Sequence, residues 1–131
     1  MNEMPGAPII AIVDDDESVR ESLADLAESV GYHTVLFASA EEFLESIHRR
    51  DSLTCLILDV RLPGMSGLEL YTRLPLSLGS TPTIFITAHA DPQMKIFAAK
   101  AGVVAVLYQP FQPQVLMKAI QRAIHSARSS H

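Results

Sequence analysis

The sequence predicts a doubly wound α/β domain, in which helices cover both faces of a parallel sheet. Short apolar runs alternate five times with segments of helical periodicity along the 131 residues, and the links between them are short. Repeated strand–helix units of this kind are typical of parallel sheets. The run at 53–58 is apolar on both faces, as a central parallel strand requires.

The first half of the chain begins with a continuous apolar run at 8–13, which predicts the first strand. Apolar residues then recur at helical spacing over 17–30, and Gly31 stands where a helix C-cap belongs. The second strand is predicted at 33–37. A second helix follows to about Arg50, and "SAEE" at its start has capping-box spacing.

The second half repeats the pattern. After the third strand, the loop "DVRLPGMSG" leads to a helix near 66–76, which Pro75 is expected to shorten or kink. The fourth strand is predicted at 82–87. Asp91 is the expected N-cap of the next helix, and Gly102 ends that helix.

The chain closes with a fifth strand at 103–108 and a last helix at 113–127. Residues 1–7 are expected to form a flexible N-terminus, and residues 128–131 a frayed tail or the start of a linker. The predicted domain therefore covers 8–127.

Composition excludes several classes of protein. The net charge is −5, and no run of basic residues exceeds Arg49–Arg50, which argues against direct nucleic-acid binding. The single cysteine, Cys55, allows neither a disulfide framework nor a thiolate metal site, and it is expected to be inert core. With no signal peptide and no apolar stretch of bilayer length, a cytoplasmic protein without membrane contact is expected.

Polar residues gather where the predicted strands end, which is where ligands bind in open α/β sheets. Asp14 to Glu17 follow the first strand and Asp59 follows the third, while Thr87 and Gln109 mark the ends of the fourth and fifth. Asp16 and Glu17 are best explained as the cap and first-turn acids of the first helix.

Asp14 and Asp15 exceed what one N-cap needs, whereas Asp59 has a plain alternative as the first residue of a Pro-Gly turn. Carboxylates that meet at one edge of a sheet repel one another unless a cation joins them. Hard oxygen ligands of this kind suit Mg²⁺. The sequence therefore predicts a Mg²⁺ site at this edge.

Four segments carry a family resemblance: "IVDDDESVR", "LILDVRLPGMSGLEL", "IFITAHAD" and "AGVVAVLYQPF". In this order and at this spacing they resemble the receiver domain of two-component response regulators, over about 8–127. The second segment most resembles the FixJ-like branch, whose members often carry a LuxR-type DNA-binding domain after the receiver. The resemblance implies a flavodoxin-like sheet of five strands in the order 2-1-3-4-5 with five helices.

The resemblance also implies roles for single residues. Asp59 would accept a phosphoryl group from a sensor histidine kinase or a phosphotransfer protein. Asp15 would bind Mg²⁺ directly and Asp14 through water, and Asp59 and the backbone carbonyl of Arg61 would complete the metal site. Thr87 would donate its hydroxyl to a phosphoryl oxygen. The only catalysis would be the chain's own phosphorylation and dephosphorylation.

Two positions depart from the family pattern. Gln109 stands where the family keeps a Lys before Pro110, and Val106 stands at the position of the switch aromatic, with Tyr108 two residues further along the same strand face. An amide donates hydrogen bonds but cannot neutralise charge. We expect Mg²⁺ binding and phosphorylation to persist, with weakened coupling to the face of the fourth helix, fifth strand and fifth helix. Alternatively, Gln109 only satisfies loop backbone groups and Val106 is sheet core. The resemblance also implies a cis Gln109–Pro110 bond.

Three functions stay open from the sequence. They are a phospho-acceptor receiver, a degenerate receiver that acts as a phosphorylation-independent interaction domain, and a Mg²⁺-dependent phosphohydrolase. The last is disfavoured because Arg61 stands where a general acid–base is needed. Ile96 and Met117 fall outside the packing stripes of their helices, so a partner face or a homodimer through the fourth helix, fifth strand and fifth helix is one expectation. The five histidines are expected to be surface or packing residues.

Overall fold

Five parallel strands form one sheet in the order β2-β1-β3-β4-β5, which confirms the predicted fold class and strand order. The computed structural model describes residues 8–47, 53–75, 78–89 and 91–129. The strands are β1 (Ile9–Val13), β2 (His33–Phe37), β3 (Cys55–Asp59), β4 (Thr83–Thr87) and β5 (Ala105–Tyr108). The helices are α1 (Glu17–Ser29), α2 (Ala40–Ser46), α3 (Gly67–Thr72), α4 (Pro92–Ala101) and α5 (Pro113–Ser129).

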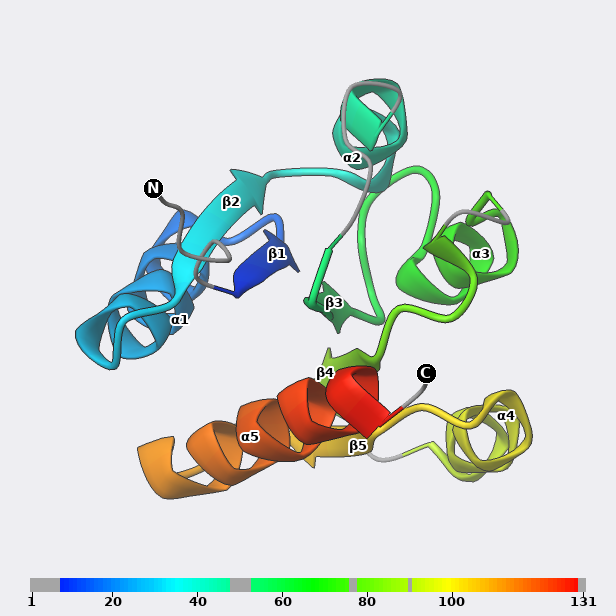
Figure 1. Ribbon diagram of the computed structural model, residues 1–131. Helices are drawn as coiled ribbons and strands as arrows, with labels where there is room; N and C mark the ends of the chain where they lie inside the picture. Colours follow the sequence, from blue (N-terminus) through cyan, green and yellow to red (C-terminus); the bar gives the residue numbers. More distant parts are fainter. Residues whose placement is uncertain (1–7, 48–52, 76–77, 90, 130–131) are drawn as a thin grey trace.

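The helices form two layers around the sheet (Figure 1). Helices α1 and α5 cover one face, and α2, α3 and α4 cover the other. Successive residues of each strand point to opposite faces, so Ile10 and Ile12 of β1 pack with α1 and α5, whereas Ala11 and Val13 pack toward the other layer. The central strand β3 is buried on both sides, as its unbroken apolar sequence predicts.

Side-chain caps fix the starts of the helices as the sequence predicts. Asp16 caps α1, and Asp91 caps α4 by accepting a hydrogen bond from the Gln93 N–H at 2.9 Å. In the capping box of α2, Ser39 Oγ accepts from the Glu42 N–H at 3.0 Å, and Glu42 Oε1 accepts from the N–H of residue 38 at 2.7 Å. These caps satisfy backbone donors that a helix leaves unpaired at its N-terminus.

Strands β1 and β4 begin one residue later than predicted, and β3 and β5 begin two residues later. Strand β3 begins at Cys55 instead of residue 53. The Thr54 N–H still pairs with Ile9 O at 2.9 Å, but the Ile9 N–H bonds to the Thr54 hydroxyl instead of a main-chain carbonyl. Strand β5 begins at Ala105 instead of residue 103, because the N–H of Val103 still bonds to Ala98 O at the end of α4. Both differences arise from local hydrogen bonds that hydrophobic periodicity does not report.

Two helices also differ in length from the prediction. Helix α3 ends at Thr72, because the N–H of Arg73 closes the last turn on Leu70 O and Pro75 has no N–H with which to continue it. Helix α5 runs to Ser129, two residues beyond the predicted 127. The predicted end of the second helix at Arg50, the N-terminal segment 1–7 and residues 130–131 lie outside the described residues.

The burial of single side chains tests the expectations for Cys55, Ile96, Met117 and the histidines. Cys55 is fully buried, and burial raises its thiol pKa to about 12, which fits inert core. Ile96 is exposed as expected, but the expectation for Met117 was wrong, because its side chain is half-buried against the core on the α1–α5 side of the sheet. His33, His89 and His125 are exposed, whereas His48 and His131 lie outside the described residues.

Among the described residues, none of the helices is long and apolar enough to cross a membrane.

Candidate functional site

Three carboxylates meet at the C-terminal edge of the two central strands. Asp14 and Asp15 directly follow β1, and Asp59 is the last residue of β3, which pairs with β1. One oxygen from each of the three side chains lies within 4.8 Å of the others. Asp14 is 3% exposed, Asp59 is half-buried and Asp15 is exposed. The structure thus brings together the three acids that the sequence predicts.

Asp14 is held on several sides. Its N–H donates to Phe37 O at 3.1 Å, its Oδ1 accepts from the Asp16 N–H at 2.9 Å, and its carbonyl oxygen accepts from Arg20 Nη1 at 2.7 Å. Asp16 instead caps α1 by accepting from the Val19 N–H. The two neighbouring acids therefore have different roles: the Asp16 side chain caps α1, whereas the Asp14 side chain lies in the carboxylate cluster.

The β3–α3 loop is fixed around Asp59. Asp59 Oδ1 accepts a hydrogen bond from the Arg61 N–H at 3.0 Å, and the described residues provide no hydrogen bond to its other oxygen. The N–H of Gly67 donates to Val60 O at 2.9 Å, which brings the start of α3 back to the end of β3. From α2, Glu41 Oε2 accepts from the Met65 N–H at 2.9 Å.

The electrostatics of the cluster favour a cation. Burial, and then the charges of Asp14 and Asp15, raise the pKa of Asp59 to about 6, although the Arg61 N–H opposes this shift. Burial also raises the pKa of Asp14, against the Asp16 N–H and the nearby Arg20. Partly buried carboxylates that repel one another are stabilised when a hard cation binds between them. The donor set therefore fits Mg²⁺.

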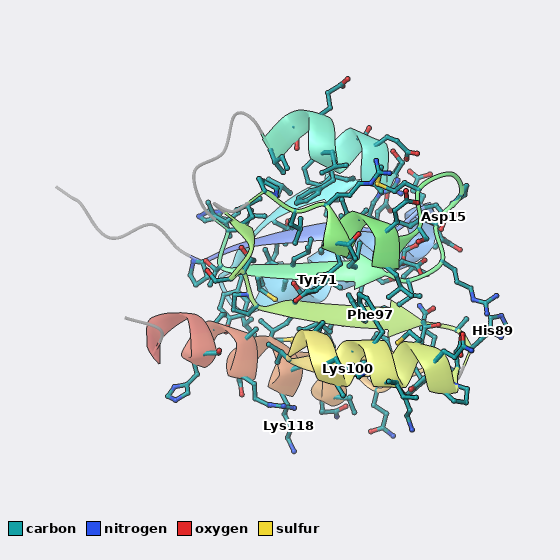
Figure 2. All side chains as sticks on the ribbon, turned by 90° about the vertical axis from the view of Figure 1, so that its right-hand side faces the viewer. Asp15, Tyr71, His89, Phe97, Lys100 and Lys118 are labelled. Atoms are coloured by element: carbon teal, nitrogen blue, oxygen red, sulfur yellow. The ribbon has the colours of Figure 1, made fainter. Side chains whose placement is uncertain are left out.

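Thr87 ends β4 at the same edge of the sheet, because β4 pairs with β3 next to Asp59. Its side chain is buried, and its hydroxyl donates to His89 O at 3.1 Å and accepts from the His89 N–H at 3.2 Å. Figure 2 shows His89 and Asp15 at the same end of the sheet. The hydroxyl thus lies in a small turn at the edge where the acids meet.

Gln109 follows β5, and its N–H donates to Thr87 O at 2.8 Å. The Gln109–Pro110 peptide bond is cis, which confirms that expectation. The side chain borders a groove of about 530 Å³ between α1 and the start of α5, where Val19 and Phe111 are among its neighbours. Among the described residues, no hydrogen bond joins its amide to Asp14 or Asp59. Gln109 therefore places no positive charge beside the carboxylates of Asp14 and Asp59.

Val106 and Tyr108 point to the same face of β5, as predicted, and both pack on the side of the sheet that α4 covers. Lys95 of α4 places its Nζ 5.8 Å from the centre of the Tyr108 ring. The Tyr108 hydroxyl is buried and has no hydrogen-bond partner among the described residues. Val106 is half-buried sheet core and carries no polar group toward the site.

Sequence reasoning missed three residues that support the site: Arg20, Glu41 and Gly67. Gly67 carried a signal, since a glycine at the first turn of a helix often marks a close backbone approach. Nothing in the sequence pointed to Arg20 or Glu41, because each side chain hydrogen-bonds to the main chain of another segment. Only tertiary structure brings Glu41 to a loop 24 residues away.

Comparisons with known proteins agree with this geometry. Residues 10–121 match the family model described as the response regulator receiver domain. The chain is 45% identical over 120 residues to Nodulation protein W of Bradyrhizobium diazoefficiens, covering 92% of this chain and 52% of that protein. It is 36% identical over 118 residues to the transcriptional regulatory protein FixJ of the same organism, covering 90% and 57%.

The fold also has close structural neighbours. The crystal structure of a CheY-like response regulator receiver domain protein from Methanospirillum hungatei superposes with a TM-score of 0.85 at 26% identity, covering 96% of this chain and all of that one. The chain spans about half the length of the curated relatives that it matches.

Proposed function

The chain belongs to the receiver-domain family of response regulators, a signalling family of two-component systems that accepts phosphoryl groups, and from that premise we propose that Asp59 is the phospho-acceptor. The observation that carries the proposal is the position of Asp59 at the end of β3, with the carboxylates of Asp14 and Asp15 beside it. One of its oxygens is held by the Arg61 N–H, which leaves the other free to attack.

The proposed reaction is an in-line phosphoryl transfer. The free carboxylate oxygen of Asp59 attacks the phosphorus of a phosphohistidine on a histidine kinase or phosphotransfer protein, and the P–N bond breaks as the new P–O bond forms. The electron pair leaves with the imidazole, which takes up a proton. Asp59 must be ionised to attack, and a pKa of about 6 leaves it largely ionised at neutral pH.

The residues around Asp59 have supporting roles in this proposal. The Thr87 hydroxyl turns from His89 O and donates to a phosphoryl oxygen, which stabilises charge that builds up during transfer. Asp15 and Asp59, the carbonyl of Arg61 and, through water, Asp14 would hold Mg²⁺. When bound, this ion supplies positive charge that offsets the acids and the equatorial phosphoryl oxygens.

A degenerate receiver is the second candidate, and Gln109 is the observation that favours it. No ammonium reaches the acids from β5, so a phosphorylated Asp59 would lack the charge-assisted contact that the family's Lys provides. We infer that phosphorylation persists with weak coupling to the face of α4, β5 and α5. A symmetrical homodimer through this face, a cytoplasmic location and control of transcription through a longer protein remain predictions.

Exact-mass measurement after incubation with acetyl phosphate tests the proposal. We expect the mass of one phosphoryl group to appear on the peptide that contains Asp59, only when Mg²⁺ is present, and to disappear in Asp59→Asn. Asp16→Asn is the matched control, because it removes a neighbouring carboxylate that caps α1 and lies outside the cluster of Asp14, Asp15 and Asp59. An unlabelled wild-type protein that still binds Mg²⁺ would favour the degenerate receiver instead.

A further inference from the structure

Strand β2 lies at one border of the sheet. It pairs only with β1, in an unbroken register from His33 to Phe37, and Figure 1 shows it at the border beside α1. The His33 N–H donates to Pro8 O at 2.9 Å, and Phe37 O accepts from the Asp14 N–H at 3.1 Å. Because hydrogen bonding alternates along a strand, residues 33, 35 and 37 turn their main-chain groups toward β1.

The main-chain groups of Thr34 and Leu36 point the other way, and we call these two N–H and two C=O groups the open edge. Among the described residues, no strand pairs with them. The side chain of Leu36 is also 40% exposed, whereas the interior strand β4 is buried throughout. The open edge therefore offers two donors, two acceptors and an apolar contact to an added strand.

The sequence of β2 does nothing to block the addition of a strand. Natural edge strands are commonly protected by charged residues, by Pro or by a bulge. The strand reads "HTVLF", which contains no Lys, Arg, Asp, Glu or Pro, and it pairs with β1 one residue for one, without a bulge. The charges on the neighbouring elements therefore decide which partner the open edge accepts.

The surroundings of the open edge are acidic. Residues 8–47, which build β1, α1, β2 and α2, contain ten Asp and Glu residues against a single Lys or Arg, which is Arg20. The guanidinium of Arg20 is bonded to Asp14 O, beside the carboxylate cluster. Among the described residues, the one ion pair lies on α3, so no ion pair neutralises the acids of α1 and α2. A partner at this edge therefore meets negative charge.

Three acids bring this charge to the edge itself. Glu17, Glu21 and Glu28 are exposed and lie on one side of α1, because they are spaced by four and seven residues. Glu28 accepts a hydrogen bond from the Thr34 hydroxyl, so this side of α1 lies beside β2. On the opposite face of the sheet, Val35 offers an apolar surface. An added strand would thus meet carboxylates on one face and apolar side chains on the other.

We propose that the open edge binds an extended segment of a different protein, in which Lys or Arg alternates with Val or Ile. The pleat of such a strand directs its cations to the acids of α1 and its apolar residues to the side of Val35. A second copy of this chain would bring the α1 acids of both copies together, and nucleic acid would meet a surface of its own sign. The proposal does not depend on phosphorylation of Asp59.

Amide hydrogen exchange of the full chain, followed by NMR, tests the proposal. The probe is a peptide of about ten residues that alternates Lys and Val, which is long enough to form one strand. A saturating amount should slow exchange of the Thr34 and Leu36 amides about tenfold. The Val35 amide is the internal control, because it already faces β1 and should change much less. Protection of Thr34 and Leu36 that is present without peptide and rises with protein concentration would show self-pairing and overturn the proposal.

Two methylated peptides separate strand addition from simple charge attraction. One carries N-methyl groups on every Lys and the other on every Val, so each loses one set of main-chain donors and keeps all its charges. An added strand turns only one set of N–H groups toward β2. In anisotropy titrations we expect only one of the two peptides to lose affinity, by about tenfold. Equal affinities of the two methylated peptides would overturn the proposal.

Three variants locate the site. Glu28→Gln keeps an acceptor for Thr34 and should weaken peptide binding about threefold and reduce its salt dependence, whereas Glu69→Gln, which removes an acid on α3, should not. Leu36→Pro removes an N–H of the open edge, leaves the bonds to β1 in place and should abolish binding. If Leu36→Pro does not fold, the methylated peptides give the same answer on the unchanged chain. The proposal is overturned if the Lys–Val peptide does not bind, if duplex DNA binds as tightly, or if Glu28→Gln behaves like Glu69→Gln.

Discussion

Gly67 lies directly against the main chain of Asp59, so that a side chain at position 67 would collide with the Asp59 carbonyl group and the α-carbon of Val60. The Gly67 N–H meanwhile donates to Val60 O. The start of α3 is thus packed against the end of β3 with room for a hydrogen atom only, and this contact sets the position of the proposed phospho-acceptor.

Gly67→Ala should therefore destabilise the fold by at least about 3 kcal/mol, because the colliding atoms belong to backbone that cannot move aside. Chemical unfolding measures the loss. Gly102→Ala is the control: its site is open but has a positive φ of 75°, so strain alone should cost about 1 kcal/mol. Equal losses at the two glycines would show that the close approach to Asp59 is unimportant.

Asp59→Asn should stabilise the metal-free protein at pH 7.5. The folded-state pKa of Asp59 is about 6, above its ordinary value of 3.8, so the fold prefers the protonated side chain. Its contribution to stability is complete below about pH 4 and is lost as the pH rises through 6. After allowance for partial exposure, the neutral amide should raise the free energy of unfolding by about 1–2 kcal/mol at pH 7.5.

Two conditions check this cause. At about pH 3 the variant and the wild type should unfold alike, because Asp59 is then largely protonated in both the folded and the unfolded chain. Saturating Mg²⁺ should stabilise the wild type more than the variant. A stability gain of equal size at about pH 3 and at pH 7.5 would point to packing instead of ionisation.

Glu41 should control the order of the loop that follows Asp59. Its carboxylate accepts the Met65 N–H, and this bond is the largest cause of the lowered pKa of Glu41. Glu41→Ala should lower the protection of the Met65 amide against hydrogen exchange, and acidification through the lowered pKa of Glu41 should do the same once exchange is compared with the intrinsic rate at each pH. Glu45→Ala, a change on the same helix without this bond, should leave exchange at Met65 as it was.

Tyr108→Phe should raise the free energy of unfolding by up to about 1 kcal/mol, because the buried Tyr108 hydroxyl has no partner and loses its hydration on folding. Tyr71→Phe gives the opposite sign. Its hydroxyl donates to Ala101 O at 3.3 Å, so its removal should cost about 0.5–1 kcal/mol. If both variants lose stability, the Tyr108 hydroxyl must find a partner in solution.

These predictions combine features that the sequence could and could not indicate. Apolar periodicity, caps and the acids at strand ends predicted the sheet and the meeting of Asp14, Asp15 and Asp59, because each depends on local pattern and on the geometry of parallel strands. The bond from Glu41 to the β3–α3 loop could not be predicted, since it joins segments that are distant in sequence.

The surroundings of Gln109 likewise could not be predicted from the sequence. The sequence alone indicates that a glutamine follows β5. The groove that its side chain borders could not be predicted, because it depends on how α1 packs beside the cis Gln109–Pro110 bond. Likewise, the partial burial of Asp59, which raises its pKa, depends on contacts from several elements.

Gln109→Lys tests how much the missing ammonium matters. The main chain at this position is tied to Thr87 O, so the longer cationic side chain would start beside the β4 end of the site. If it reaches the acids, it should lower the pKa of Asp59 by about one unit, stabilise the metal-free protein at pH 7.5 and increase labelling by acetyl phosphate. Gln112→Lys adds the same charge to an exposed position further along the loop and should do none of these. Amide hydrogen exchange in α4 and β5, compared with and without phosphorylation, reports how strongly phosphorylation of Asp59 is coupled to the face of α4, β5 and α5. If Gln109→Lys changes neither labelling nor exchange on that face, then the Gln109 side chain is incidental. The weak coupling proposed for this receiver then has to originate in Val106.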